Sequence, residues 1–418
     1  MVRKLLSFLG TTDYQEVAYG FGGREHRTRY APAALCRLLQ PDPETLVIFA
    51  TQEAENKHSA GLREAVGDCL PLELVRIPAG AREEEMWDIF RIITEQVGEG
   101  DEVYFDITHG YRSLPFLSFL ALAYLRTAKG AAIRGVYYGA YEARKDGHTP
   151  IFDLTPFVEL LDWTVAADRF IRFGDGRDLA DLAGREKSEW ARRGEVENKE
   201  MFAWGRLADS LRDISLALRL IRPHEVMEKA HALQEHLRTH FAGSEARRVY
   251  IEPLRVLLER VGQAFAPLAL DKPRQAGSRQ DLLHQRRLIR WYFEHQQYVQ
   301  ALALAREWLV SWVIARIGHA APVYGRERRE QAERALNEAG HRLRDKKAGE
   351  TAGAENVSEP SIPEDVAQLW ASITERRNDL LHAGMRAQPV SAKTVVDDVA
   401  KFVESIEKLS IPGAENST

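Results

Sequence analysis

The pattern of apolar and polar residues changes character near Pro156. Before it, short apolar runs of strand length alternate with longer segments in which apolar residues recur at helical spacing. After it, helical spacing continues nearly to the end of the chain, as in residues Phe202 to Ile221. The first part therefore predicts a doubly wound α/β fold, and the rest predicts an all-helical region.

Five strands and two helices are predicted in the first part. The strands cover Lys4 to Leu9, Thr45 to Ala50, Leu72 to Ile77, a run beginning at Val103, and Ile133 to Tyr138. The helices cover Glu83 to Gln96 and Phe116 to Lys129, the second with Pro115 near its start and Gly130 just past its end. Proline at the start and glycine after the end are typical helix boundaries.

Three of these strands lead into loops that are rich in hydrogen-bonding groups. The candidate ligand-binding residues in these loops are Gly10, Thr11, Thr12, Thr51, Thr108, His109, Gly110, Arg112 and Ser113. Open α/β sheets bind nucleotides and phosphates at the carboxyl ends of their strands, where backbone N–H groups and helix dipoles are available. We therefore expect a polar ligand site at one sheet edge, although any one of these loops is also explained as an ordinary turn.

A second candidate site lies near the C-terminus, where Arg377, Asn378 and His382 occur on one predicted amphipathic helix. Arginine stabilises growing negative charge, and histidine transfers protons near neutral pH. At about 100° per residue, Asn378 and His382 share a face, so the amide can orient the imidazole ring. Arg377 lies about 140° from His382, so we expect two copies in a symmetric dimer to form a shared active site. The alternative is a core helix whose histidine caps the last carbonyls and whose left-handed terminator is Gly384.

Other segments of the helical region qualify this hypothesis. Residues Tyr298 to Ile317 predict a long helix that packs against the motif helix. On it, Glu307 either lines the active-site cleft or forms a surface salt bridge. Ser361 and Glu364 have the spacing of a capping box, so the motif helix is expected to begin there. The basic residues of 326–334 either contact phosphate or form an ordinary charged helix face.

Two stretches resemble known families. Arg377 to His382, Arg-Asn-Asp-Leu-Leu-His, resembles the signature of HEPN domains, which are small helical ribonuclease modules. Asp106 to Arg112, Asp-Ile-Thr-His-Gly-Tyr-Arg, together with the Leu-Gly-Thr-Thr start, resembles the CARF domain of CRISPR-associated proteins. The chain as a whole resembles the CARF-HEPN ribonucleases of type III CRISPR systems. This implies an α/β, Rossmann-like CARF domain at 1–156, a helical linker region at 157–285 and an all-α HEPN domain at 286–418.

The resemblance also implies an activity. It implies an endoribonuclease that cleaves single-stranded RNA when a cyclic oligoadenylate, with cyclic tetra-adenylate favoured, binds the CARF dimer. The scheme needs no metal: the RNA 2′-hydroxyl attacks the phosphorus, His382 transfers a proton, Arg377 stabilises the phosphorane and Asn378 holds the geometry. We expect a homodimer or a higher even oligomer and no stable DNA binding. Two alternatives stay open, a non-catalytic cyclic-oligoadenylate-gated regulator or scaffold, and a ring nuclease in which His109 and Arg112 cleave the messenger.

Composition places only weak limits on these predictions of fold and function. The chain has 418 residues, of which 44% are hydrophobic and 28% charged, and its length allows roughly three domains. A net charge of -5 argues against a surface that coats nucleic acid, so any RNA contact should be local. Cys36 and Cys69 lack metal-type spacing, and we expect reduced, buried thiols in a cytoplasmic protein. The apolar N-terminal run is too short for a signal sequence, and no stretch approaches the roughly 20 apolar residues of a membrane span.

Overall fold

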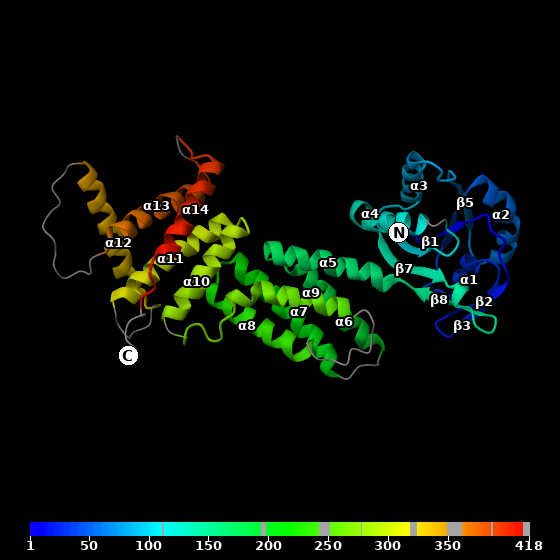
Figure 1. Cartoon of the computed structure of the whole chain (residues 1–418), viewed down its shortest axis with the longest axis horizontal. Helices are drawn as coiled ribbons and strands as arrows, with labels where there is room; N and C mark the ends of the chain where they lie inside the picture. Colours follow the sequence, from blue (N-terminus) through cyan, green and yellow to red (C-terminus); the bar gives the residue numbers. More distant parts are fainter. Residues whose placement is uncertain are drawn as a thin grey trace. The chain divides into compact units, whose positions relative to one another are not determined.

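The computed structural model describes residues 1–110, 113–193, 198–241, 251–276, 278–317, 324–348, 362–385 and 388–412. It divides the chain into two compact units, Met1–Leu161 and Asp162–Thr418. Within the described residues, every strand belongs to the first unit and the second is built of helices (Figure 1). The predicted order of fold classes, α/β first and all-helical afterwards, is confirmed.

Among the described residues, eight strands form one mixed sheet in the first unit. They are β1 (Arg3–Leu9), β2 (Val17–Phe21), β3 (Arg24–Thr28), β4 (Thr45–Ala50), β5 (Leu72–Arg76), β6 (Glu102–Asp106), β7 (Ala132–Gly139) and β8 (His148–Asp153). Their order in the sheet is β3-β2-β8-β7-β6-β1-β4-β5. β1 lies between β4 and β6 and is parallel to both. β4 and β5 lie on one side of β1, and the chain then crosses to β6 on the other side, so a topological switch point lies here.

Helices cover both faces of this sheet. They are α1 (Ala31–Leu38), α2 (Gln52–Val66), α3 (Glu83–Glu95) and α4 (Leu114–Lys129), and a short 3₁₀ helix, η1 (Tyr141–Ala143), precedes β8. α1 and α2 contribute to the core on one face, and α3 and α4 contribute to the core on the other. Cys36 of α1 is buried in the first core, but Cys69 is exposed, so the expectation of two buried thiols is wrong for Cys69. β1 alternates between the two cores, with Leu5 in the first core and Leu6 in the second. Because both faces are buried, the central strands are apolar at nearly every position, which made them recognisable in the sequence.

Three strands, β2, β3 and β8, are not predicted by the apolar pattern. β2 and β3 pair as an antiparallel hairpin joined by Gly22 and Gly23, whose φ angles are 58° and 75°. Two consecutive residues with positive φ are what a tight hairpin turn requires, and glycine adopts them readily. β3 lies at the sheet edge with the sequence Arg-Glu-His-Arg-Thr, so it has no apolar alternation. The Gly-Gly pair is the signal that could have revealed it.

The second unit is helical throughout its described residues. Its elements are α5 (Thr155–Phe173, which begins in the first unit), α6 (Arg177–Arg193), α7 (Asn198–Arg219), α8 (Pro223–His240), α9 (Ile251–Phe265), η2 (Ala266–Leu268), α10 (Ser278–Glu294), α11 (Tyr298–Ile317), α12 (Arg326–Ala348), α13 (Glu364–Leu381) and α14 (Ala392–Lys408). No described helix is long and apolar enough to cross a membrane.

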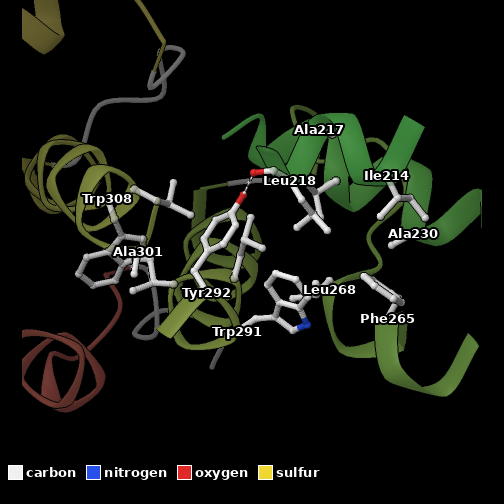
Figure 2. Close-up of a cluster of buried hydrophobic side chains, with 14 of the residues drawn as sticks. Ile214, Ala217, Leu218, Ala230, Phe265, Leu268, Trp291, Tyr292, Ala301 and Trp308 are labelled. Atoms are coloured by element: carbon white, nitrogen blue, oxygen red, sulfur yellow. Dashed lines mark hydrogen bonds between the residues drawn. The ribbon is translucent and has the colours of Figure 1, made fainter. Parts of the chain in front are cut away.

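One hydrophobic core runs through this unit, from Trp163 to Ile406. Figure 2 shows part of it, where the Tyr292 hydroxyl donates a hydrogen bond to the carbonyl oxygen of Leu218 at 2.8 Å. The predicted boundary between 285 and 286 falls inside α10. Leu282 and Leu288, on either side of this boundary, are both buried in the same core. The division into a linker region and a separate last domain stays a prediction.

α11 is the helix around which the last part of the chain packs. It contacts α10, α12, α13 and α14. Its Trp308 indole N–H donates to the carbonyl oxygen of Leu282, and its Trp312 indole N–H donates to that of Ser410, each at 2.8 Å. The predicted packing of this helix against the motif helix is confirmed, and it fixes α13 from one side.

Candidate functional site

The loops that follow β1, β4 and β6 lie at one edge of the sheet, because these strands are adjacent and parallel. The loop after β1 also contacts the loop after β6. A Cβ atom on Gly10 would lie only 3.1 Å from the carbonyl oxygen of His109. Any larger residue would crowd this carbonyl oxygen, so glycine favours the close approach of the two loops. The predicted convergence of the three loops is confirmed.

Helix α2 holds the loop after β1 in place. The Lys57 ammonium donates to the carbonyl oxygen of Thr11 at 2.7 Å, and the His58 Nε2 atom lies 2.9 Å from the carbonyl oxygen of Thr12. The Gly10 N–H donates to the Tyr14 hydroxyl oxygen at 2.7 Å. These bonds occupy the backbone of the loop. Lys57 also pairs with the exposed Asp13 at 2.8 Å, so its charge at this edge is partly neutralised.

Tyr14 lies between two histidine rings. Its ring centroid is 4.4 Å from that of His58 and 4.1 Å from that of His109. The Nε2 atom of His109 accepts the backbone N–H of Ala31, at the start of α1, at 3.2 Å. Nε2 therefore carries no proton, and burial lowers the pKa of His109 to about 3. In this structure His109 is a neutral acceptor that fixes α1, whereas the sequence pattern favoured a ligand donor.

The Thr108 hydroxyl is also engaged within the protein. It donates to Asp106 Oδ1 at 2.5 Å and accepts the N–H of Gly139 at 2.8 Å. Asp106 is fully buried at the end of β6, where Ser7 Oγ donates to its other oxygen at 2.6 Å. Burial raises the pKa of Asp106. Asp106 was not among the candidate residues, although it organises the loop that holds them.

The remaining candidates of this edge differ in accessibility. Thr51 is the N-cap residue of α2, and its buried hydroxyl accepts the N–H of Ala54 at 3.3 Å. Gly110 is half-buried, whereas Thr12 and Ser113 are exposed. Arg112 lies outside the described residues. Helices α2 and α4 both begin at this edge, and their first N–H groups and dipoles favour an anion.

The second candidate site lies at the C-terminal end of α13. Arg377 and Asn378 are half-buried on the last turns of the helix, and His382 is its exposed C-cap residue. The helix ends in a Schellman arrangement, in which the N–H of Gly384 donates to the carbonyl oxygen of Asp379 at 3.0 Å. Ala383, with φ of 53°, takes the left-handed position that glycine usually fills, and Gly384 follows with φ of 67°. The helix starts at Glu364, and the predicted cap residue Ser361 lies outside the described residues.

The Asn378 side chain is bonded to arginine and not to histidine. Its Oδ1 accepts from Arg377 Nη1 at 3.5 Å, while His382 contacts Asn378 through the backbone, N–H to carbonyl oxygen, at 3.0 Å. In the part of the chain that the structure describes, no side-chain contact joins Asn378 or Arg377 to the imidazole ring. The expectation that the Asn378 amide orients the His382 ring therefore does not hold within one protomer. The amide oxygen is bonded to Arg377, and His382 lies at the C-cap of the helix.

Arg376 and Glu307 are each engaged in ion pairs. Arg376 pairs with Asp398 of α14 at 2.7 Å and lies 3.9 Å from the buried Asp379. Glu307 pairs with Arg306 at 2.6 Å and with Arg329 at 2.7 Å. Burial by itself would raise the pKa of Glu307, but these two guanidinium groups keep it below its usual value. Glu307 thus matches the salt-bridge interpretation. One of its two partners, Arg329, belongs to the basic stretch 326–334.

The comparison with known proteins assigns the first unit. Residues 4–142 match the family model for the CARF domain of the CRISPR system endoribonuclease Csx1. The first unit therefore carries a CARF-type domain, and the chain is similar to CRISPR-associated proteins. Residues 159–268 match the second domain of the CRISPR-associated protein MJ1674. The CARF loops described above thus lie within the first matched region, and α5 to α9 account for most of the second.

A curated relative supports the same assignment. This CARF protein is 34% identical over 119 residues to CRISPR-associated protein MJ1674 of Methanocaldococcus jannaschii. The aligned part is 28% of this chain and 19% of the relative, so the match spans about a fifth of the relative's length. Neither family match extends to the residues of α13. In the described residues, no group of three or more His, Cys, Asp or Glu side chains could hold a metal ion.

Proposed function

We propose that this CARF protein is a cyclic-oligoadenylate-activated endoribonuclease that cleaves single-stranded RNA without a metal ion. The observation that carries the proposal is the exposed His382 at the end of α13, with Arg377 and Asn378 on the preceding turn, in a chain that contains a CARF domain. The motif has the composition of a HEPN active site, with an arginine, an asparagine and a histidine in that order.

The chemistry follows from the groups available. The 2′-hydroxyl of the RNA attacks the adjacent phosphorus, and the bond to the 5′-oxygen of the next nucleotide breaks. His382 transfers a proton to or from these oxygens, and Arg377 stabilises the charged phosphorane. Asn378 acts on Arg377, whose guanidinium it contacts at 3.5 Å. The products carry a 2′,3′-cyclic phosphate and a 5′-hydroxyl, and DNA has no hydroxyl to attack with.

A homodimer would complete both sites. Arg377 and His382 lie about 140° apart around one helix, and a second copy supplies the missing partner for each. Leu381 and Met385, which flank His382, are large apolar residues that are exposed. In the first unit, exposed Phe116, Leu120 and Tyr124 recur at every fourth residue along α4. Exposed apolar patches of this kind are typical of contacts between protein chains.

The CARF edge supports binding of the messenger more strongly than its cleavage. The helix N-termini and the exposed hydroxyls of Thr12 and Ser113 suit the phosphates of a cyclic oligoadenylate, and cyclic tetra-adenylate is the proposed ring. His109, the candidate base of a ring nuclease, has its Nε2 occupied by the N–H of Ala31. That bond supports a positioning role for the imidazole. Chromatography of the messenger after incubation tests this, and its conversion to linear product would favour the ring nuclease.

A cleavage assay tests the main proposal. RNA and DNA of one sequence are incubated with the protein and EDTA, with cyclic tri-, tetra- or hexa-adenylate or with none. The expected result is cleavage of RNA only, dependent on one ring size. Loss of cleavage with EDTA would indicate a metal enzyme, and cleavage that no ring stimulates would contradict the activation step.

The scaffold alternative needs a separate variant. General acid-base catalysis contributes about 100-fold to 10,000-fold, so His382→Ala should lose cleavage to that extent while it keeps messenger binding. If wild-type protein binds the messenger but leaves RNA intact, a non-catalytic regulator is the better description.

A further inference from the structure

A cleft of about 450 Å³ lies between α12 and α13. This volume is within the range of small-molecule sites. Its lining includes the polar side chains of Asn337, Arg344, Gln368, Ser372, Thr374 and Asn378. Gly340 of α12 faces Ala371 of α13, since a Cβ atom on Gly340 would lie in van der Waals contact, 3.7 Å from the Cβ of Ala371. The cleft is therefore a polar groove in which two helices come close together.

The cleft leads to the candidate active site. Ala371, Glu375 and Asn378 line it, and they follow one another along α13 at intervals of four and three residues. Residues at this spacing lie on one face of a helix. His382 is four residues beyond Asn378 and continues the same face. A group bound in the cleft would therefore lie beside the residues proposed to cleave RNA.

Two amide side chains in the cleft have their oxygen atoms occupied. The Trp370 indole N–H, which can only donate, bonds to Asn337 Oδ1 at 2.9 Å. The Arg377 guanidinium bonds to Asn378 Oδ1 at 3.5 Å. Because each oxygen faces a donor, each amino group faces the other way. Neither amino group has a hydrogen-bond partner within the described ranges, so both stay available as donors.

A buried hydroxyl in the cleft wall points to the same conclusion. The Oγ1 atom of Thr374 is buried and has no hydrogen-bond partner among the residues that the structure describes. Buried polar groups in proteins are nearly always hydrogen-bonded, and an unpaired one costs stability. Because Oγ1 has almost no accessible surface in this structure, a ligand in the cleft reaches it once the Thr374 side chain rotates toward the cleft, and the ligand then supplies the missing partner.

We infer that this cleft is a subsite for one unpaired nucleobase of the RNA, next to the scissile phosphate, and that it sets a base preference for cleavage. The inference rests on the proposed ribonuclease function. The amino groups of Asn337 and Asn378 match the carbonyl oxygens or ring nitrogens on a base edge, which are accessible in single-stranded RNA. Arg344 adds a cation for the backbone phosphate.

Two variants separate recognition from folding. Asn337→Asp keeps the oxygen that accepts from Trp370 but replaces the donor amino group with a second acceptor. Thr374→Val keeps the shape of the side chain and removes only the hydroxyl. Gln331→Glu is the matched control, because it adds the same charge as Asn337→Asp at an exposed position of α12, six residues from Asn337 and about 240° around the helix. Asn378 is left unchanged because it belongs to the proposed active site.

The experiment cleaves a random-sequence RNA pool in the presence of the activating ring and sequences the ends. For wild-type protein and Gln331→Glu we expect one base to be enriched next to the cut by about tenfold, the effect of one good base contact. Asn337→Asp and Thr374→Val should reduce or change that enrichment, with no loss of thermal stability for Thr374→Val. Unchanged base frequencies in both variants, or cleavage by wild type with no preference, would overturn the inference and leave the ribonuclease proposal intact.

A binding measurement covers the case in which wild-type protein cleaves nothing, a result that would refute the proposed function itself. RNA that contains 4-thiouridine is crosslinked to the protein, and the modified peptides are identified by mass spectrometry. Crosslinks in residues 337–344 or 368–378 would support the subsite without any cleavage. Their absence, with crosslinks elsewhere, would refute it.

Discussion

Arg376 reaches Asp398 of α14 with a nitrogen-to-oxygen distance of 2.7 Å and so ties the end of α13 to the last helix. Among the described residues, the side chain of its neighbour Arg377 bonds only to the adjacent Asn378, at 3.5 Å. Two arginines that are indistinguishable in the sequence string therefore have different environments. One is committed to a partly buried ion pair between helices, and the other remains available for a substrate phosphate.

The first prediction uses this pair of arginines. Arg377→Ala should lose RNA cleavage by at least 100-fold with little change in melting temperature, because within the described part of the chain its side chain bonds to no other helix. Arg376→Ala should lower the free energy of unfolding by about 1–3 kcal/mol, since it removes the cation beside two carboxylates of low exposure. Thermal denaturation and initial cleavage rates, measured on both proteins, check this. A destabilised Arg377→Ala with a stable Arg376→Ala would reverse the assignment.

The second prediction concerns the end of the motif helix. Ala383 has φ of 53°, a left-handed conformation that costs an L-residue about 1 kcal/mol and costs glycine much less. Ala383→Gly should therefore raise the free energy of unfolding by up to about 1 kcal/mol, as measured by urea denaturation. Gly384→Ala, at φ of 67°, should have the opposite effect. A destabilised Ala383→Gly protein would show that the turn at His382 is formed differently.

The third prediction is a pH dependence. The pKa of His109 is lowered from its ordinary value of 6.5 to about 3 because the ring is buried. Below pH 6.5 the unfolded chain binds a proton at this position that the folded protein excludes, so stability falls as the pH drops from 6.5 toward 3. The slope from this group is at most about 1.4 kcal/mol per pH unit.

The variant His109→Gln provides the control for that slope. Its side-chain oxygen can accept from the N–H of Ala31 in place of Nε2, and it does not titrate. Unfolding of the two proteins is compared between pH 4.5 and 7.5. An equal slope for both proteins would mean that His109 becomes protonated in the folded state.

The fourth prediction separates exposed from internally bonded hydroxyls at the CARF edge. Thr12→Ala and Ser113→Ala should each weaken cyclic oligoadenylate binding by about tenfold, the loss of one hydrogen bond to a charged phosphate. Thr108→Val should instead destabilise the protein by about 2 kcal/mol, because Asp106 and the N–H of Gly139 lose a partner. Calorimetric titration and thermal denaturation measure the two effects. Full affinity in both alanine variants would place the messenger elsewhere.

Strands with a continuous apolar run could be predicted from the sequence, and strands without one could not. β4 has the predicted bounds, Thr45–Ala50, because it lies between β1 and β5 and all but its first residue are buried. α11 likewise has its predicted bounds, Tyr298–Ile317. β3 was missed because an edge strand with polar residues carries no such pattern. Its sequence signal is the Gly22-Gly23 turn that precedes it.

The candidate sites show the same limit. Chain order and strand direction sufficed to bring the loops after β1, β4 and β6 together. They could not show that α1 returns to His109, 78 residues away along the chain, and uses its Nε2. They also could not show that the Asn378 amide is bonded to Arg377, because this depends on the rotamers at a helix end. Spacing therefore locates such groups, while contacts from distant segments decide which atoms remain free to act.

The hydrophobic core of the helical unit has a practical consequence for anyone who wishes to isolate the proposed nuclease half. A fragment that starts at residue 286 would cut α10 in two and strip Trp291 and Tyr292 of Phe265, Leu268 and Leu218, their neighbours in Figure 2. Such a fragment would expose the side chains of Trp291 and Tyr292 to water, and we expect it to aggregate. Expression trials should start at or before residue 155, where α5 begins, because a start at residue 162 would cut that helix in two in the same way.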